Sequence, residues 1–363
     1  MITRIRYQIE KSLESFLKKV RKEYKLHLAS PILYKSMKDF TLRGGKRIRP
    51  LLLILSYKGY SRRKIKPPDN LYNAATCTEF LHNFMLIHDD IIDRSDLRRG
   101  KPTMHRLLRK AAKTKDQEKL GSDLSIIVGD ILYALAIDAF LSIHEDPRRK
   151  EKALKYFVKT AAFTAMGEFI DIIHSVKNIG RITEKDVFLN YTLKTAKYTF
   201  ECPLVIGAIL AGASTQDTQK LSRLGIMIGQ AFQIQDDILG IFGSEKSIGK
   251  SILSDIAESK KTLLVCHAHQ KLKKQERKRF LKHFSKTKKT YRDLVAIRKI
   301  FVQSGSLRYS LNKIKTLLDQ SLAITLQLKM KKRYRQLLWD SLTVLFKNSR
   351  QIAQSNHIAG GRF

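Results

Sequence analysis

The residues best suited to chemistry are two groups of aspartates, each of which ends an apolar stretch of the chain. The first group contains Asp89, Asp90 and Asp93, and the second contains Asp236 and Asp237. On a helix, Asp89 and Asp93 would share one face about 6 Å apart, where like charges destabilise the structure. The helix macrodipole also disfavours negative charge at a C-terminal helix end. A bound cation would offset both costs.

Carboxylate clusters of this kind suit hard cations. Mg²⁺ is the best match, because it takes one or two carboxylates and keeps positions for phosphate oxygens. A solvated acidic turn would explain one group alone. Two groups, each after an apolar helical stretch, favour a shared metal site, although 147 positions separate Asp89 from Asp236. We therefore expect most of the chain to act as scaffold that brings the two groups face to face.

Several basic residues lie beside glycines or near the aspartates. They are Lys46, Arg47 and Arg49 after Gly44 and Gly45, Arg98 and Arg99 after the first acidic group, and Lys194, Lys250 and Lys260. Arginine offers paired hydrogen bonds and lysine a point charge, so such cations beside metal-binding carboxylates would form a receptor for diphosphate. Any one of them is also compatible with an ordinary surface position, because the chain has 70 lysines and arginines.

The elements that must position these residues are predicted to be helices. Apolar residues recur at three- and four-residue spacing, and no region shows convincing strand alternation, so we expect an all-α fold. The segment 71–93 should carry the first acidic group on a buried helix, and 216–239 the second. Ser122 is expected to cap a buried helix that runs to about Ile143.

Two further local features concern the stretch 183–212, which is expected to be helical. Thr183 and Asp186 resemble a capping box with aspartate in the place of glutamate or glutamine. Pro203 should kink the helix, because proline lacks the backbone N–H that an α-helix interior uses.

Composition bounds the organisation and the partners. We find no linker and no internal repeat, so we expect one helical domain over 1–363, with a very basic helical part over 262–363. The formal net charge of +37 is compatible with an anionic substrate, an anionic membrane surface or nucleic acid. The chain has neither zinc-finger spacing nor an RNP-type motif, so nucleic acid is not expected as its main partner.

The location is inferred from cysteines and targeting signals. The three cysteines are too few and odd in number for a disulfide framework, which favours a reducing compartment. The N-terminus has no apolar signal-peptide core. The apolar stretches are interrupted by charge or too short to span a bilayer. We therefore expect a cytoplasmic protein.

The ordered motifs resemble one family. GGKRIRP, HNFMLIHDDIID followed by RRGKPTMH, a Lys194–Thr195 pair, and FQIQDD followed by GKSILSDIAESKKT occur in this order. Over 40–262 the chain resembles the trans-isoprenyl diphosphate synthases, which include the geranylgeranyl and farnesyl diphosphate synthases. The resemblance implies an all-helical bundle around a deep central cavity, usually in a homodimer.

The resemblance also implies a reaction. An allylic diphosphate would be ionised with the help of three Mg²⁺ ions, and the double bond of isopentenyl diphosphate would attack the resulting carbocation before a proton is lost. No protein nucleophile is required. This agrees with the residues, among which no Ser/His/Asp or Cys/His constellation stands out. Catalysis would rest on metal and electrostatic stabilisation of the leaving group and on positioning.

The resemblance further implies a role for each matching residue. Asp89 and Asp93 would bind two Mg²⁺ ions and Asp236 the third, supported by Asp90 and Asp237. Isopentenyl diphosphate would be held by Lys46, Arg49, His82 and Arg99, with Gly45 in the same loop. The allylic diphosphate would be held by Arg98, Lys194, Lys250 and Lys260, while Thr195 and Gln233 line the reacting centre. Apart from the motif, His82 is typical of a buried core histidine.

Three positions depart from the family pattern. Gly240 replaces the last aspartate often found in the second motif, Glu168 stands where glutamine is more usual, and Ser259 replaces a glycine before the lysine pair. Asp171, three residues after Glu168, is kept. None of these changes removes a primary metal ligand.

The length of the product is predicted from the helix before the aspartates. Phe84 precedes Asp89 by five residues, so it should lie roughly 7 to 8 Å deeper along the helix. A ring there would stop a growing prenyl chain, and resembles the geranylgeranyl-producing type. Met85 is flexible and not aromatic, which argues against a farnesyl-specific pair. We predict a C20 product, with C15 as the alternative.

Two other functions remain open. A class I terpene cyclase also uses an aspartate-rich helix end, but would not need the cations Lys46, Arg49 and Arg99. A non-catalytic partner subunit of a heteromeric synthase typically loses the acidic motifs, and both are present here.

Overall fold

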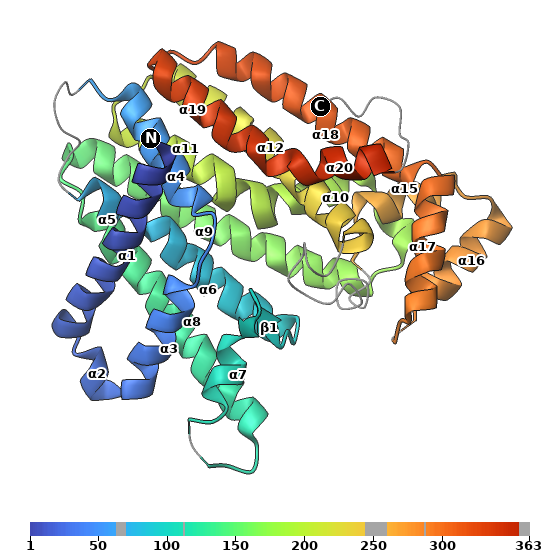
Figure 1. Cartoon of the computed structure of the whole chain (residues 1–363), viewed down its shortest axis with the longest axis horizontal. Helices are drawn as coiled ribbons and strands as arrows, with labels where there is room; N and C mark the ends of the chain where they lie inside the picture. The colour runs from blue at the N-terminus through green and yellow to red at the C-terminus, as the bar shows by residue number, and fades with distance from the viewer. Residues whose placement is uncertain (63–69, 112, 244–259, 287, 356–363) are drawn as a thin grey trace. The chain divides into compact units, whose positions relative to one another are not determined.

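The computed structural model describes residues 1–62, 70–111, 113–243, 260–286 and 288–355 (Figure 1). Almost all of its regular structure is helical, which confirms the predicted all-α class. Contacts group the chain into two compact units, one of 1–158 with 203–218 and one of 159–202 with 219–363. Each unit has its own buried apolar side chains. The single-domain organisation and the deep central cavity stay predictions.

Unit 1 contains most of the elements before residue 158. They are α1 (Ile2–Glu23), α2 (Leu26–Ala29), α3 (Pro31–Leu42), α4 (Ile48–Tyr60), α5 (Leu71–Ala75), α6 (Cys77–Ile92), β1 (Leu97–Arg98), β2 (Lys101–Pro102), α7 (Met104–Leu108), α8 (Gln117–Leu141), and the beginning of α9 (Pro147–Val176). Most of α11 (Cys202–Leu210) also belongs to this unit.

Helix α6, which ends at the first acidic group, is held from two sides. Phe80 of α6 meets Phe16 of α1, with ring centroids 5.3 Å apart. Both rings are buried, and Phe16 lies on a stripe of α1 that buries a residue every three or four positions. On another side α6 packs against α8. This packing fixes the direction in which the aspartates leave the core.

Helix α8 differs from the expectation in two ways. It begins at Gln117, and Asp116 caps it by accepting a hydrogen bond from Lys119 N at 2.9 Å, so Ser122 is not its N-cap. In the described part of the chain, α8 is also the one helix whose length and apolar composition would allow it to cross a membrane. This is contrary to the expectation that no stretch would be long and apolar enough. It nevertheless carries Asp123, Asp130 and Asp138 and packs against α6 and α7, as core helices of globular proteins do.

A small hairpin that was not expected follows α6. Strands β1 and β2 pair antiparallel, with Arg98 opposite Lys101. Arg99 and Gly100 form the two-residue loop, and both have positive φ (56° and 71°), as a type I′ turn requires. The hairpin therefore projects Arg98, Arg99 and Lys101 from one rigid turn.

Unit 2 contains the remainder of α9 and the later helices. These are η1 (Ile179–Arg181), α10 (Glu184–Asn190), η2 (Tyr191–Glu201), most of α12 (Thr215–Phe242), α15 (Leu263–Lys271), α16 (Lys274–Phe284), α17 (Tyr291–Gln303), α18 (Ser306–Leu326), α19 (Lys332–Thr343), η3 (Val344–Phe346) and α20 (Lys347–Ser355).

The stretch 183–212 is divided by a change of winding. The predicted capping box is confirmed: Asp186 N donates to the Thr183 hydroxyl, and Thr183 N donates to the Asp186 carboxylate. After α10 the chain forms an eleven-residue π-helix, η2, and returns to α-helix at Cys202, directly before Pro203. Because proline has no N–H, the return falls where an internal helical hydrogen bond would be missing anyway.

Candidate active site

The first acidic group is organised by Arg98. The Arg98 Nε donates to an Asp90 oxygen at 2.7 Å, and its Nη2 lies 3.1 Å from an Asp89 oxygen. The Asp90 side chain is 0% exposed, whereas that of Asp89 is 23% exposed. Asp93 ends the helix, its N–H donates to the Asp89 carbonyl at 2.8 Å, and it is partly exposed. Asp89 and Asp93 are thus the accessible carboxylates, and Asp90 is an internal partner of Arg98.

This arrangement bears on the role predicted for Arg98. Its guanidinium is partly buried and already engaged by two carboxylates. Arg98 therefore holds the aspartates in place, and an allylic diphosphate would have to share it with them.

Arg47 is a structural residue rather than part of an exposed cationic loop. Its Nη1 lies 2.7 Å from Glu79 and its Nε 2.7 Å from Glu10, and its Nη2 donates to the carbonyls of Thr41 and Arg43. Its side chain is almost wholly buried, and it adopts a positive φ of 46° at the start of α4. This network shapes the loop that carries Lys46, which is exposed.

Arg99 closes the glycine loop from the hairpin. Its Nη1 donates to the Arg43 carbonyl at 3.1 Å and to the Gly44 carbonyl at 3.0 Å. A Cβ at Gly45 would lie 3.1 Å from the same nitrogen, so this approach requires glycine there or a shift of the arginine. The structure therefore places Arg99 against Gly44 and Gly45 of the loop that carries Lys46, and anion binding by this loop stays a prediction.

His82 lies buried on α6 near these cations. Burial, followed by the charges of Arg49, Arg99, Arg98 and Arg47, holds its pKa well below the usual range. The imidazole is therefore neutral at pH 7 and can donate through one nitrogen only. It would add a hydrogen bond but no charge to a diphosphate site.

Phe84 lies between α6 and α8. Its ring centroid is 5.2 Å from that of Tyr133 and 4.6 Å from that of His88. Phe84 and Met85 are both only partly buried. The three rings are in contact on the α6 segment that precedes the aspartates, and the role of Phe84 as a chain-length floor stays a prediction.

The second acidic group belongs to α12 in unit 2. Asp236 is exposed, whereas Asp237 is partly buried and accepts hydrogen bonds from Tyr191 Oη and from Gln233 Nε2 (3.1 Å). Burial raises the pKa of Asp237 to about 7, against the effect of these two donors and of Lys260. Thr195 Oγ1 donates to Gln233 Oε1 at 2.6 Å, so the two residues predicted to line the reacting centre are in contact.

Lys194 is held by the two carboxylates of α9. Its Nζ lies 2.7 Å from Asp171 and 2.8 Å from Glu168. Asp171 also accepts a hydrogen bond from Asn190 Nδ2 at 2.7 Å. Burial acts to raise the pKa of Asp171, but the charges of Lys194 and Lys260 outweigh it, so that this pKa lies below its usual value. Glu168, which stands where glutamine is more usual, therefore gives Lys194 a second carboxylate partner. Lys250 and Ser259 lie outside the described residues.

The donor set suits a metal that substrate completes. In the part of the chain that the structure describes, no group of three or more His, Cys, Asp or Glu side chains forms a ready-made metal cage. Mg²⁺ does not need one, because it binds through one or two carboxylates together with phosphates and water. The accessible Asp89 and Asp93 fit that requirement within unit 1, and Asp236 fits it as a single carboxylate of unit 2.

The family is decided by comparison with known proteins. The polyprenyl synthetase family model matches residues 30–301. The chain belongs to the polyprenyl synthetase family. A short chain isoprenyl diphosphate synthase of Methanocaldococcus jannaschii is 34% identical over 269 residues, covering 74% of this chain and 76% of that one. A geranylgeranyl diphosphate synthase of Saccharolobus solfataricus is 35% identical over 271 residues, covering 74% and 75%.

The solved structures agree. A geranylgeranyl pyrophosphate synthase from Corynebacterium glutamicum, complexed with isoprenyl diphosphate and magnesium, superposes with a TM-score of 0.87 at 26% identity, covering 96% of this chain and 99% of that one. This polyprenyl synthetase is therefore an enzyme, a trans-prenyltransferase, as the motifs predicted.

Two residues of this polyprenyl synthetase site were missed from the sequence. Tyr191 is buried and joins Asp237 to the start of α15, because Leu263 N donates to its hydroxyl at 2.9 Å. Asn190 orients Asp171. The only feature of the sequence that could have pointed to Asn190 or Tyr191 is that both lie about one helical turn before the Lys194–Thr195 pair.

Proposed function

We propose that this polyprenyl synthetase is a geranylgeranyl diphosphate synthase, which condenses isopentenyl diphosphate with an allylic diphosphate to a C20 product with three Mg²⁺ ions. The observation that carries the product length is the contact of Phe84 with Tyr133, on the helix that leads to Asp89. Relatives named geranylgeranyl diphosphate synthase support it. Another relative is named geranylfarnesyl diphosphate synthase, so the chain length of the product is the part of this proposal that needs a direct test.

The side chains divide the work of the reaction. The bound metal ions would neutralise the departing diphosphate. Asp89, Asp93 and Asp236 would hold those ions, and Arg98 and Tyr191 would fix the neighbouring carboxylates Asp90 and Asp237.

Other side chains would bind and orient the substrates. Lys46 and Arg99 would bind isopentenyl diphosphate, with neutral His82 as a hydrogen-bond donor. Lys194 would bind the allylic diphosphate. The Thr195–Gln233 pair presents oxygens to the developing cation, which is the electrostatic contribution expected where no nucleophile acts.

The direct test is product analysis with Mg²⁺, isopentenyl diphosphate and each allylic primer in turn. A C20 alcohol after dephosphorylation supports the proposal, and a C15 or longer alcohol corrects only the chain length. Release of diphosphate without condensation would indicate a terpene cyclase. No reaction from folded protein with any primer would favour a non-catalytic partner subunit.

Phe84→Ala is expected to lengthen the product by at least one C5 unit, because it removes the ring that contacts Tyr133 on the helix before Asp89. Chromatography of the dephosphorylated products measures it. Phe80→Ala is the matched control, since Phe80 lies one turn earlier and packs on Phe16. An unchanged product from Phe84→Ala would remove Phe84 as the floor.

Glu168→Gln is expected to lower the KM for the allylic diphosphate about threefold, because it removes one of the two carboxylates that compete for Lys194. Asp171→Asn is the contrasting variant, since Asp171 also holds Asn190 and its loss should misplace the lysine. Steady-state kinetics with varied allylic substrate compares them. Equal KM values for wild type and Glu168→Gln would mean that Lys194 does not gain contact with this substrate.

We also propose a homodimer in the cytoplasm. The exposed Ile126 and Ile127 on α8 offer an apolar face for a second copy. The three buried cysteines carry no disulfide, which is compatible with a reducing compartment. Light scattering with size-exclusion chromatography would test the dimer, and a monomer mass would reject it.

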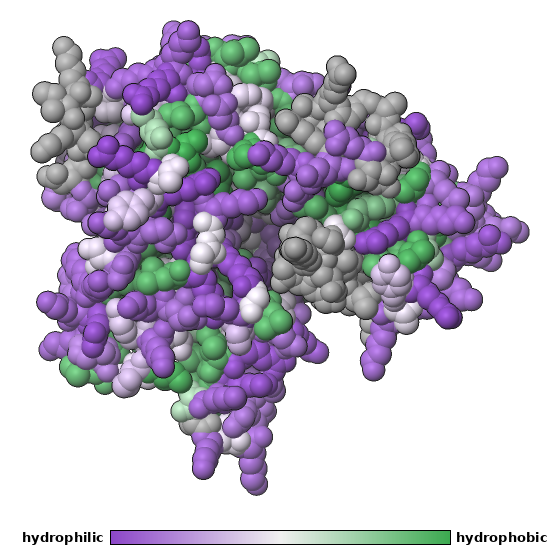
Figure 2. Space-filling view, viewed as in Figure 1, coloured by the Kyte–Doolittle hydropathy of each residue, from purple (hydrophilic) through white to green (hydrophobic). Residues whose placement is uncertain are grey.

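A peripheral contact with anionic membrane is proposed for the region of α16. Figure 2 shows mainly hydrophilic residues over α16 and α17. The exposed basic residues between 271 and 289 are Lys271, Lys273, Lys274, Lys278, Arg279, Lys282, Lys286 and Lys288. Such a cluster is attracted to anionic headgroups and screened by salt. Failure to sediment with phosphatidylserine vesicles at low salt would reject it.

A further inference from the structure

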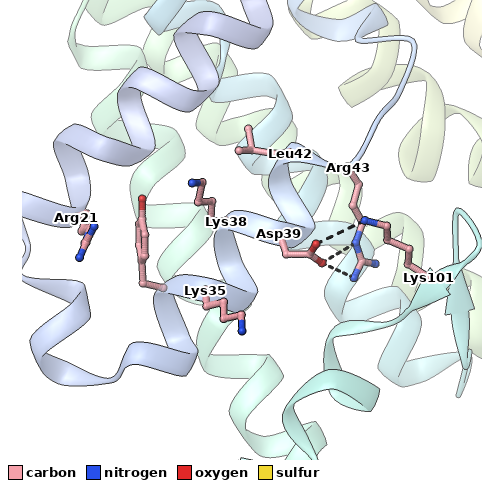
Figure 3. A pocket seen from close by; sticks show the side chains of 8 residues that line it. Arg21, Lys35, Lys38, Asp39, Leu42, Arg43 and Lys101 are labelled. Carbon is pink, nitrogen blue, oxygen red and sulfur yellow. Dashed lines mark hydrogen bonds and ion pairs between the residues drawn. The ribbon is translucent and has the colours of Figure 1, made fainter.

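A basic cavity of unit 1 has no part in the site described above. It has a volume of about 500 Å³, within the range of small-molecule sites. Lys35, Lys38, Asp39 and Leu42 line it from one face of α3, because their spacing of three and four residues places them together. The rest of the lining comes from α1, from Tyr34 in the first turn of α3, from Arg43 directly after α3 and from β2 (Figure 3).

Positive charge dominates the lining. Five cations, Arg21, Lys35, Lys38, Arg43 and Lys101, face one carboxylate, Asp39. Asp39 is engaged by Arg43 at 2.9 Å and by Lys101 at 3.7 Å, as the dashed lines in Figure 3 mark. Three of the four net positive charges therefore lie with Arg21, Lys35 and Lys38. Like charges around one cavity repel, and a bound anion would relieve that repulsion.

One of the cations, Arg43, is held by the protein before any ligand binds. The Arg43 side chain is 4% exposed, lies over the Phe40 ring and donates from Nη1 to the Pro102 carbonyl at 2.8 Å. The Arg21 guanidinium carbon lies 5.4 Å from the centre of the Tyr34 ring. Guanidinium groups offer phosphate paired hydrogen bonds and lysines offer point charges, so both kinds of side chain can contribute to phosphate recognition here.

We propose that this cavity binds a diphosphate-bearing anion at a site distinct in its residues from the substrate site. The diphosphate class follows from the charge, because four net positive charges on the lining suit a ligand with several negative ones. Leu42 and Tyr34 supply only a small apolar wall. The recognised group is therefore the diphosphate itself, whether free or attached to a prenyl chain.

Occupancy of the cavity would reach the substrate loop through shared chain segments. The carbonyl of Arg43 accepts hydrogen bonds from Arg99 and Arg47, and Gly44 follows directly. Lys101 lies two residues after Arg99 in the same hairpin. A ligand that engages Lys101 beside the already fixed Arg43 would thus restrict the hairpin that carries Arg99, and with it the loop of Lys46 that Arg99 contacts. By linkage, substrate on those cations would change affinity at the cavity by the same factor.

The test is calorimetric titration of inorganic diphosphate into the full chain with a chelator present. The Lys46→Ala/Arg49→Ala background removes predicted substrate cations and should keep the binding. Adding Lys35→Ala/Lys38→Ala should weaken it about tenfold, equal to about 1.4 kcal/mol. Adding Lys11→Ala/Lys22→Ala, which removes two exposed lysines of α1, should not. Binding that disappears with Lys46 and Arg49, or ignores Lys35 and Lys38, would overturn the proposal.

A measurement on wild-type protein avoids dependence on variants that fail to fold. Inorganic diphosphate should protect Lys35, Lys38 and Lys101 from chemical acetylation and leave Lys11 and Lys22 reactive, as read by mass spectrometry. Equal reactivity with and without diphosphate would contradict the site. Repeating the titration with geranylgeranyl diphosphate shows whether the ligand is free diphosphate or a prenyl diphosphate. A higher affinity than that for inorganic diphosphate would identify a prenylated ligand, and an equal affinity would identify the free anion. Neither result depends on which product the enzyme makes.

Discussion

Arg47→Ala is expected to lower the free energy of unfolding by about 3–5 kcal/mol, the usual cost of removing one partner from a buried ion pair. Glu79 would keep its charge in a nearly closed environment with its 2.7 Å partner gone. Two backbone carbonyls, of Thr41 and Arg43, would also lose a donor. Chemical denaturation followed by circular dichroism measures the change.

The control is the adjacent Lys46→Ala, which removes the same charge from an exposed position and should change stability little. The variant that keeps its stability, Lys46→Ala, should instead show its effect in the kinetics. Lys46→Ala should raise the KM for isopentenyl diphosphate while the protein stays folded. If Arg47→Ala were as stable as Lys46→Ala, the buried network would not be what shapes the glycine loop.

Asp89→Asn and Asp90→Asn are expected to fail in different ways, although the residues are neighbours. Asp89→Asn should reduce kcat by about 10²–10³ and raise the Mg²⁺ concentration needed for half activity, because it alters an accessible metal-binding carboxylate. Asp90→Asn should lower stability by about 1.5–3 kcal/mol, because it removes the charge that receives the Arg98 hydrogen bond. Both are isosteric changes, so neither creates a cavity.

Metal titrations of activity, together with thermal unfolding in the presence of a chelator, distinguish the two effects. Unfolding with a chelator reports stability independently of any loaded ion. An Asp89→Asn protein that lost stability and kept its metal dependence would reverse the assignment of these two aspartates. The exposed Asp236 is expected to behave like Asp89.

Local patterns predicted the parts of the protein that depend on neighbouring residues. The all-α class and the Thr183–Asp186 capping box needed only short-range spacing, and both were confirmed. The start of α8 was misplaced because its first turn is polar and exposed, so the apolar pattern begins after the helix does. The hairpin was missed because two-residue strands are too short to show alternation.

The role of a residue could not be predicted from local sequence spacing where it depends on a partner far away in the sequence. Arg47 looks like its neighbours Lys46 and Arg49 in the sequence, and only Glu10 and Glu79, 37 and 32 positions away, make it structural. Tyr191 likewise gains its role from Asp237, 46 positions away. The motifs named Thr195 and Gln233 for the reacting centre, but the hydrogen bond between them, 38 positions apart, was not predicted.

The π-helix η2 makes the number of residues in this segment as important as their types. Tyr191, Lys194 and Thr195 all lie in η2, and their partners lie on other helices. A wide turn of this kind holds one residue more than an α-helical turn would. If evolution deleted a residue between Ala196 and Phe200, the segment would be free to rewind as α-helix. The side chains within η2 would then change their spacing relative to their partners on the other helices. Relatives that share these side chains are therefore expected to share the length of the segment as well.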